Sequence, residues 1–182
     1  VVVEGDRVSG LTIGRRASVG RPDRTGNKIL NNQAGGVTID AARAITLIGN
    51  EIIGNGAAGT PQIELVNGAN DGIAPPVIDS VTARVRGQRM PQYDVRGSVS
   101  GEAGDRFYVD FYGNRAVDAR QIYLGRVLVT VRSGGVGTFR YLARANTSET
   151  GGVDSISATA TVATTLLGST SEFSAEVVPT LS

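Results

Sequence analysis

Residues 26–55 of the sequence are GNKILNNQAGGVTIDAARAITLIGNEIIGN, and the phrase GN-x-I-x-x-N occurs in them twice. The first copy begins at Gly26 and the second at Gly49, an offset of 23 residues. Repetition at a spacing of this size is typical of solenoids, in which each repeat forms one coil that stacks on the next. The phrase therefore indicates a stacked first half of the chain.

Short β-forming runs accompany each copy of the phrase. Residues 37–39, VTI, follow the first copy and residues 63–65, IEL, follow the second. The glycines and β-branched residues disfavour a helix, and strands of this length are too short for an ordinary sheet. We therefore expect parallel ladders between successive coils, with Ile29 on Ile52 and Ile39 near Leu65. Residues 9–14, SGLTIG, form a looser and earlier copy.

Asparagine occupies equivalent positions in the two copies. Asn27 corresponds to Asn50, and Asn32 corresponds to Asn55. Because asparagine tolerates left-handed backbone and its amide can bond to a neighbouring coil, we expect two ladders at the corners of the stack. These four residues are interpreted as structural rather than as sites of glycan binding or glycosylation.

The second half of the chain has a different pattern. Residues 71–76, DGIAPP, contain Gly and Pro without periodicity and indicate a linker. Residues 77–182 contain seven runs of alternating polar and apolar residues, which predict an antiparallel β-sandwich. The runs are 77–85, 93–100, 106–113, 122–131, 137–144, 155–163 and 171–178. The four phenylalanines are expected to form the core of this sandwich, namely Phe107, Phe111, Phe139 and Phe173.

Both halves resemble known families. Residues 10–55, from GLTIG to EIIGN, are similar to the coils of right-handed parallel β-helix proteins of the pectate-lyase-like superfamily. The phrases GSVSG (97–101), FYVDFY (107–112), YLG (123–125), ISATAT (156–161) and TSEFS (170–174) resemble the immunoglobulin-like sandwich that often follows such repeats in bacterial surface proteins. The resemblance implies an all-β fold in which a short right-handed parallel β-helix of about three coils, residues 1–70, precedes an immunoglobulin-like sandwich, residues 77–182. Such coils serve lyases, hydrolases and non-catalytic surface proteins alike, so the fold does not decide the function.

Composition excludes several kinds of site. The chain contains no cysteine and no histidine, which removes disulfides, thiolate metal sites, and the commonest general base and metal ligand. A net charge of +1 without a clustered basic loop disfavours nucleic acid as a partner. No apolar run approaches the roughly 18 residues that cross a bilayer, so membrane insertion is not expected. We expect no metal and no cofactor.

Few residues suggest chemistry or ligand binding. Asp40 and Glu64 lie at loosely corresponding positions of adjacent coils, but outward-facing acids more simply meet water, so no enzyme activity is expected. The candidates for ligand binding are Tyr108 and Tyr112, which could stack on a sugar ring if they share an exposed face. Arg15 and Arg16 are the candidates in a loop that could contact an anionic glycan.

The first residues of the chain raise the question of an open end. Val1, Val2 and Val3 begin in mid-coil, and an uncovered solenoid end presents unpaired backbone groups. We expect self-association through this edge, by head-to-tail stacking that gives a filament if the rotation does not close. The expected function is a non-catalytic structural or adhesive module outside a bacterial cell or on its surface, with a cell-surface glycan as the other candidate partner. The alternatives are a fragment of a polysaccharide lyase or hydrolase, and a carbohydrate-binding module.

Overall fold

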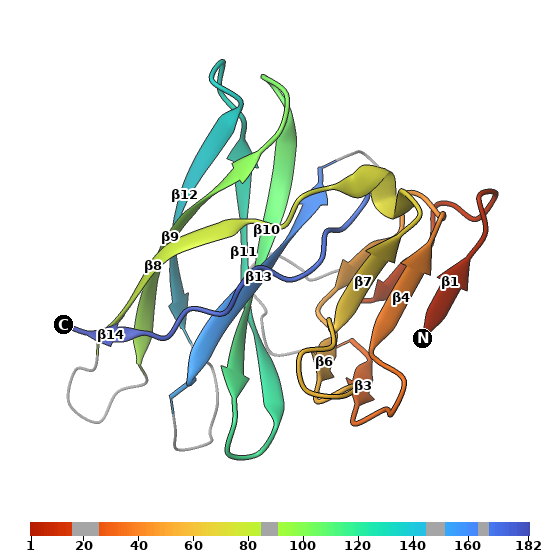
Figure 1. Cartoon of the computed structure of the whole chain (residues 1–182). Coiled ribbons are helices and arrows are strands. Elements are labelled where there is room, and N and C mark those ends of the chain that lie inside the picture. The colour runs from red at the N-terminus through yellow and green to blue at the C-terminus, as the bar shows by residue number, and fades with distance from the viewer. Residues whose placement is uncertain (16–25, 85–90, 145–151, 164–167) are drawn as a thin grey trace.

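The computed structural model describes residues 1–15, 26–84, 91–144, 152–163 and 168–182 (Figure 1). Strands account for almost all of the regular structure, and the one helical element in these residues is the short 3-10 helix η1 (Ala69–Gly72). The prediction of an all-β fold is therefore confirmed. The described residues contain no helix that is long and apolar enough to cross a membrane.

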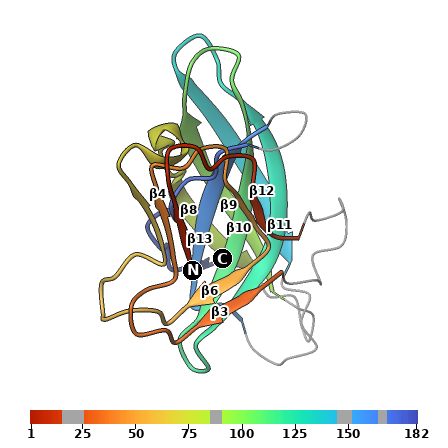
Figure 2. The same ribbon diagram turned by 90° about the vertical axis from the view of Figure 1, so that its right-hand side faces the viewer.

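The first half consists of seven short strands in three small parallel sheets. They are β1 (Val2–Glu4), β2 (Thr12–Gly14), β3 (Lys28–Leu30), β4 (Val37–Asp40), β5 (Thr46–Ile48), β6 (Glu51–Ile53) and β7 (Ile63–Val66). β4 pairs with both β1 and β7, β5 pairs with β2, and β6 pairs with β3, all in parallel. Successive strands thus belong to the three sheets in turn. β1, β2 and β3 make the first round, β4, β5 and β6 make the second, and β7 returns to the first sheet. Figure 2 looks at this half and shows β3 and β6 side by side.

The register of these ladders places apolar residues above one another. Ile29 lies beside Ile52, and Ile39 lies beside Leu65, as expected from the repeat. The enclosed side chains form one cluster of buried apolar residues, which includes Val3, Val37, Ile45, Leu47 and Ile63. The 23-residue offset holds only for β3 and β6, because loops of unequal length separate the strands of the other ladders.

The interpretation of residues 9–14 as an earlier copy of the phrase is wrong. Thr12–Gly14 pair with Thr46–Ile48, the strand that comes just before the second copy, and not with either copy itself. The segment shares Gly and Ile with the phrase but lacks its asparagines. Two shared residue types, both common in this chain, were therefore not enough to predict which strand this segment pairs with.

The second half is a sandwich of two antiparallel sheets, apart from one short parallel strand at the end of the chain. Its strands are β8 (Val77–Arg84), β9 (Gln92–Ser100), β10 (Arg106–Arg115), β11 (Arg120–Thr130), β12 (Val136–Arg144), β13 (Ser155–Val162) and β14 (Thr180–Leu181). One sheet has the order β11-β10-β13 and the other has the order β12-β9-β8-β14. Between them, Phe111 meets Phe139 edge-on at 5.4 Å and stacks on Tyr141 at 4.8 Å between ring centroids. The alternating runs correctly predicted six of these strands.

The seventh predicted strand, residues 171–178, is wrong. This segment follows β13 but touches it through isolated bridges at Thr170 and Val177, and the last strand, β14, pairs with β8 instead. Phe173 is accordingly not part of the sandwich core. Its ring meets that of Tyr112 edge-on at 5.2 Å and packs against the apolar cluster of the first half. Phe107, Phe111 and Phe139 do lie in the sandwich core.

Candidate functional site: a capped edge and an open edge

The outer face of the β11-β10-β13 sheet is covered by the first half of the chain. On β10, Phe107, Val109 and Phe111 face the sandwich core, so Asp110 and Tyr112 face the other way. Both of these outward residues are nevertheless buried, with 0% and 3% of their surface exposed. The two halves therefore share a packed interface, and the polar contacts in it form the first part of the site.

Side-chain oxygens in this interface cap the last strands of the three ladders. Because N–H groups alternate in direction along a strand, those of residues 45, 47 and 49 point away from β2, that of residue 52 points away from β3, and that of residue 65 points away from β4. All five donate to side chains of η1 or the second half. The bonds are Ile45 to Asn70 Oδ1 (2.8 Å), Leu47 to Thr170 Oγ1 (3.0 Å), Gly49 to the Tyr112 hydroxyl (3.3 Å), Ile52 to Gln121 Oε1 (3.0 Å) and Leu65 to Glu172 Oε1 (2.8 Å).

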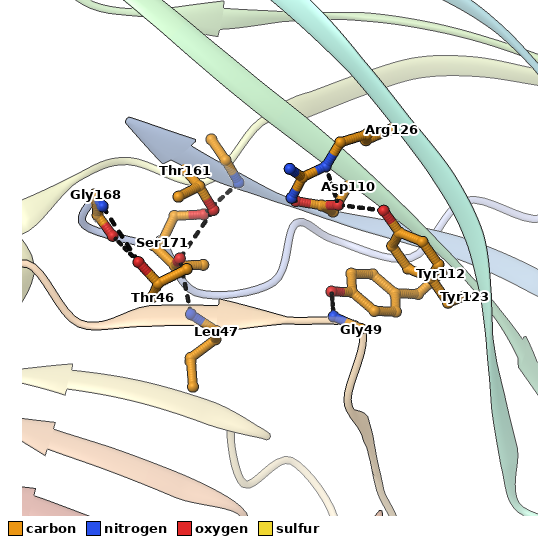
Figure 3. Close-up of polar contacts among 12 residues, drawn as sticks. Thr46, Leu47, Gly49, Asp110, Tyr112, Tyr123, Arg126, Thr161, Gly168 and Ser171 are labelled. Atoms are coloured by element: carbon orange, nitrogen blue, oxygen red, sulfur yellow. Dashed lines mark hydrogen bonds and ion pairs between the residues drawn. The ribbon is translucent and has the colours of Figure 1, made fainter. Parts of the chain in front are cut away.

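Segment 168–177 lies between the two halves and bonds to both. On one side the Thr46 hydroxyl donates to the Gly168 carbonyl oxygen (2.7 Å), and the Thr170 N–H donates to the Ile45 carbonyl oxygen (3.1 Å). On the other side, the hydroxyl oxygens of Ser171 and Ser174 accept hydrogen bonds from N–H groups of β13. Figure 3 shows the contacts of Thr46 and Leu47 with this segment. The segment thus occupies the place of a strand while using hydroxyl groups as acceptors.

A buried charge pair lies beside the cap. Asp110 accepts hydrogen bonds from Arg126 Nε (3.0 Å) and Nη2 (2.9 Å) and from the Tyr123 hydroxyl (2.6 Å), as Figure 3 shows. Burial raises the pKa of the Asp110 carboxyl, and the Arg126 guanidinium and the Tyr123 hydroxyl oppose that shift. Burial and the nearby Asp110 charge both raise the pKa of Tyr112 and of Tyr123, so both hydroxyls stay protonated and can donate. The pair orders this end of the interface.

Glu51 is a second buried acid at the interface, with 1% of its side chain exposed. Its Oε1 accepts from the Gln121 N–H (3.2 Å), and its carboxylate lies 3.5 Å from Lys28 Nζ and 3.7 Å from Arg120 Nε. Its Oε2 has no hydrogen-bond partner among the described residues. This carboxylate connects β3, β6 and β11 through charge.

The opposite edge of the ladders is uncapped in the described residues, where β1, β2 and β3 each pair on one side only. Backbone hydrogen bonds join Val1 and Gly5 to β4, Leu11 and Arg15 to β5, and Asn27 and Asn31 to β6. The backbone groups between them therefore point outward. These outward positions are Val2, Glu4, Thr12, Gly14, Lys28 and Leu30.

The three valines that were expected to form this edge differ in burial. Val1 and Val2 are 54% and 69% exposed, whereas Val3 is 8% exposed and belongs to the apolar interior. Leu11, which directly precedes β2, is 43% exposed. The edge therefore combines unpaired backbone groups with exposed apolar side chains.

Both asparagine pairs are joined by hydrogen bonds, and the bonds have one direction. Asn50 Oδ1 accepts from the N–H (3.0 Å) and Nδ2 (3.1 Å) of Asn27, and Asn55 Oδ1 accepts from the N–H (3.0 Å) and Nδ2 (2.7 Å) of Asn32. Each carboxamide oxygen thus accepts from the earlier copy of the phrase. Among the described residues nothing donates to Oδ1 of Asn27 or Asn32, so within these residues both ladders end there.

The backbone conformation of the ladder asparagines is not the left-handed one that was expected from the sequence. None of the four ladder asparagines has a positive φ, whereas the neighbouring Asn31 does, at 55°. The amide, and not the left-handed backbone, therefore explains asparagine at these positions. Different constraints explain the glycines that precede Asn27 and Asn50. A Cβ on Gly26 would lie 2.9 Å from Asn50 Oδ1 and from the Gly14 Cα, and Gly49 has a φ of 63°.

The tyrosine site expected from the sequence is contradicted by the structure. Tyr112 is buried against Tyr123 and Phe173 and bonds to Gly49, so its ring cannot stack on a sugar. Tyr108 lies on the same face but is half-buried, and the Arg126 guanidinium covers its ring at 4.5 Å from the centroid. The alternation had correctly placed both rings on one face, but a second layer covers that face.

The remaining candidates do not converge on a site. Arg15 is exposed, and Arg16 lies outside the described residues. Asp40 is level with Val66 and accepts from Asn67 Nδ2 (2.7 Å), whereas Glu64 is level with Thr38 and accepts from its hydroxyl (3.4 Å). The two acids are therefore not a pair. Within the ranges that the structure describes, no three acidic side chains gather closely enough to hold a metal ion.

Comparison of the sequence with protein-family models gives no match, and comparison with curated proteins gives none either. The functional argument therefore depends on the geometry of the capped edge and of the open edge. The sequence contained one signal for the cap that its interpretation missed. Thr170, Ser171 and Ser174 place hydroxyl groups at short spacing in a run that was taken for a strand.

Proposed function

We propose that this chain is a non-catalytic structural or adhesive module that works outside a bacterial cell or on its surface. In this proposal the three parallel sheets are coils of a right-handed parallel β-helix, and the sandwich is an immunoglobulin-like domain that terminates them. The resemblance of residues 10–55 and 97–174 to such surface proteins supports the family and the location. The difference between the two edges of the ladders supports the structural role.

The observation that carries the proposal is the cap itself. Unpaired strand edges are sites where further strands add, and proteins cover the edges that must stay free. Here five outward N–H groups on β5, β6 and β7 and just beside them are satisfied by side chains. A cap of this kind stops a stack in one direction and leaves the other direction available.

The same observation narrows the kind of assembly. Head-to-tail stacking needs both edges of the coils, and one of them is occupied by the sandwich. We therefore propose pairing of two copies through their β1, β2 and β3 edges, which is an isologous contact that closes at a dimer. The filament that the sequence suggested would need a second route of association. The open edge fits another coil of the same phrase, whichever chain carries it.

Proline at outward-facing positions of the open edge tests this proposal. Glu4→Pro and Thr12→Pro together remove two outward N–H groups and keep the inward ones, which pair with β4 and β5. Wild type is expected to shift from monomer to dimer as concentration rises, and the double-proline variant is expected to stay monomeric. Sedimentation equilibrium measures both masses.

The matched control is Glu4→Ala with Thr12→Ala, which removes the same side chains and keeps both N–H groups. It should dimerise as wild type does. A wild-type protein that stays monomeric at the highest concentration, or a proline variant that still dimerises, would contradict pairing through this edge. Wild-type masses that grow beyond a dimer would contradict the closed contact.

The non-catalytic part of the proposal has its own test. Asp40 and Glu64 each bond to a neutral neighbour and are not level with one another, so they do not form the acid pair that the sequence suggested. Incubation with polygalacturonate and with alginate, with calcium present, should produce no unsaturated chain ends. Their appearance, measured by ultraviolet absorbance, would favour the alternative of a polysaccharide lyase fragment.

A further inference from the structure

The outer face of the β12-β9-β8 sheet carries a group of arginines that the proposed assembly does not use. Val81, Ala83, Tyr93, Val95, Phe139 and Ala143 lie in the sandwich core. The residues that alternate with them on the same strands therefore face outward. Four of these are arginines that are exposed to solvent, and they define the arginine face: Arg84, Arg96, Arg140 and Arg144.

The register arranges these arginines in two rows across three strands. Arg84 and Arg144 both lie level with Gln92, and Arg140 lies level with Arg96. Neighbouring strands are about 4.8 Å apart, so the backbones of Arg84 and Arg144 are roughly 10 Å apart. Four residues of strand separate the rows, which is roughly 13 Å. The arginine face is therefore a flat array and not a single point of charge.

Two of the four guanidinium groups are held in place by neighbours on β9. Arg140 bonds to both carboxylate oxygens of Asp94, with Nε at 2.9 Å from Oδ1 and Nη2 at 2.6 Å from Oδ2. When the Gln92 carboxamide is oriented so that its oxygen faces Arg144, that oxygen accepts from Nε (2.9 Å) and Nη2 (3.0 Å) of Arg144. The hydrogen bonds from Arg140 hold the pKa of the Asp94 carboxyl below its ordinary value, so Asp94 is ionised at neutral pH. Fixed side chains lose less conformational entropy when a ligand binds.

Among the residues that the structure describes, the surroundings of the arginines are mostly polar and exposed. Leu142, which is 55% exposed, lies level with Asp94 between the two rows. Thr82 and Ser80 on β8 and Thr138 on β12 add hydroxyl groups to the same face. In Figure 1, β12, β9 and β8 lie on the side of the molecule away from β1, β4 and β7. A ligand on the arginine face would therefore leave the open edge free.

We propose that the arginine face binds an acidic polysaccharide whose sugar residues carry carboxylate groups. A planar guanidinium can bind a carboxylate with two parallel hydrogen bonds. The Nε and Nη2 groups of Arg140 and Arg144 already bond to Asp94 and Gln92, so a ligand carboxylate would meet their remaining outward N–H groups and the exposed Arg84 and Arg96. The hydroxyl groups and Leu142 offer contacts to the uncharged parts of the sugar rings. This site is separate from Tyr108, Tyr112 and Arg15, where a glycan was first expected.

The same features argue against other anionic partners. Single-stranded nucleic acid binds through aromatic platforms, but Tyr93, Phe139 and Tyr141 of these strands face the sandwich core. Duplex DNA and anionic membranes call for a denser cluster of basic residues than four arginines that have Asp94 among them and the exposed Asp79 on the neighbouring part of β8. The arginine face therefore favours a polymer whose carboxylates are spaced apart over one that carries a dense row of phosphates.

Polygalacturonate is the probe for the test, and Arg84→Gln with Arg144→Gln is the variant. This pair of substitutions leaves Asp94 with Arg96 and Arg140, so no buried carboxylate loses its partner. Wild type is expected to bind the polymer with an affinity that falls as salt is added. The variant is expected to bind about tenfold more weakly or worse, because it loses two groups that can form charged hydrogen bonds to the polymer. Calorimetry at fixed ionic strength measures both affinities.

The matched control is Arg7→Gln with Arg15→Gln, which removes the same charge from exposed positions of the first half. Its affinity should stay within about twofold of wild type. Neutral dextran, a single-stranded oligonucleotide and vesicles of phosphatidylcholine with phosphatidylserine are the comparison ligands. The proposal fails if wild type does not bind polygalacturonate, or if both variants lose affinity equally. It also fails if the oligonucleotide or the vesicles bind more tightly than the polysaccharide.

The result does not depend on dimerisation. The Glu4→Pro and Thr12→Pro variant keeps every residue of the arginine face and should bind polygalacturonate as wild type does, apart from any gain from two linked sites. Failure of the arginine face and failure of pairing through the open edge are therefore distinguishable in separate measurements.

Discussion

The asparagines of the repeated phrase differ in the number of hydrogen bonds that their side chains make. Asn55 is 1% exposed, and its carboxamide bonds to Asn32, Gln62 and the Ile29 carbonyl oxygen. Asn32 is exposed, and its side chain makes one bond of the ladder, to Asn55. The two positions are equivalent in sequence, yet only the later one is surrounded by groups that depend on it.

Alanine substitutions at the two positions should therefore have unequal effects. Asn55→Ala leaves the Asn32 N–H without its acceptor and removes the amide bond to the Ile29 carbonyl oxygen, which still pairs within the β3–β6 ladder. A buried group that loses its partner costs about 1–3 kcal/mol. We expect Asn55→Ala to lower the free energy of unfolding by about 2–4 kcal/mol. Asn32→Ala should cost less than about 1 kcal/mol, because its place is open to water.

Urea unfolding followed by circular dichroism measures both changes. Asn31→Gly is a suitable control at the same corner, because Asn31 has a positive φ that glycine adopts easily. Equal losses for Asn55→Ala and Asn32→Ala would contradict the one-directional ladder.

Tyr112 marks the limit of residue-scale prediction from this sequence. Alternation in FYVDFY correctly separated the inward phenylalanines from the outward tyrosines. Alternation says which face a side chain occupies, but it says nothing about what lies on that face. Here the partner of the face is the first half of the chain, and the Gly49 N–H that meets the Tyr112 hydroxyl is far away in sequence. No local pattern could have predicted the contact.

Among the structural elements, segment 168–177 bonds to both halves of the molecule although it is not a regular strand. Six strands of the sandwich were predictable because each alternates over eight or more residues. Segment 168–177 also alternates in part, which is why a strand was expected at 171–178. Hydroxyl groups of Thr170, Ser171 and Ser174 replace backbone groups as acceptors, so the chain leaves regular pairing and reaches β5.

Thr170 is the residue of this segment that joins the two halves most directly. Its hydroxyl accepts from the Leu47 N–H at 3.0 Å and shares a hydrogen bond of 2.8 Å with the Thr161 hydroxyl. Thr170→Val keeps the shape of the side chain and removes both bonds. Because the Leu47 N–H and the Thr161 hydroxyl are then buried without a partner, we expect the free energy of unfolding to fall by about 2–4 kcal/mol.

Thermal unfolding of the two proteins, with Thr180→Val as the control, checks this expectation. Thr180 is exposed and makes one bond of 3.3 Å, so its substitution should change stability by less than about 0.5 kcal/mol. A Thr170→Val protein as stable as wild type would mean that the cap contributes little to holding the halves together.

For the whole molecule, the asymmetry between the two edges predicts a gradient of protection. The N–H groups of Leu47, Ile52 and Leu65 are bonded within the interface, and opening them requires the two halves to separate. The outward N–H groups of Val2, Thr12 and Lys28 have no strand beside them in the described residues.

Hydrogen exchange measured at high dilution should therefore be slow in β5, β6 and β7 and fast at the outward positions of β1, β2 and β3. Raising the protein concentration should slow exchange at those outward positions if two copies pair there. Equally slow exchange in β3 and β6 at high dilution would contradict the assignment of one capped edge and one open edge.

The sequence predicted the two-part, all-strand organisation but could not predict how the parts meet. The repeated phrase correctly aligned β3 with β6, because identical side chains stack best on one another. It could not align β1 with β4, or β2 with β5, because the loops between those strands differ in length and the strands share no phrase. The cap could not be predicted either, because its acceptors lie in β10, in β11 and near residue 170, far in sequence from the strands that they cap.

Lys28 has a practical consequence of this arrangement. It is the one lysine in 182 residues, and it lies in β3 at the open edge with 59% of its side chain exposed and its amine 3.5 Å from Glu51. A reagent that couples to lysine amines therefore has a single side-chain target. Attachment of the protein to a sensor surface through that amine would hold it by the open edge and turn the arginine face toward the solution. A fluorophore at the same position would report directly on whatever docks against β3.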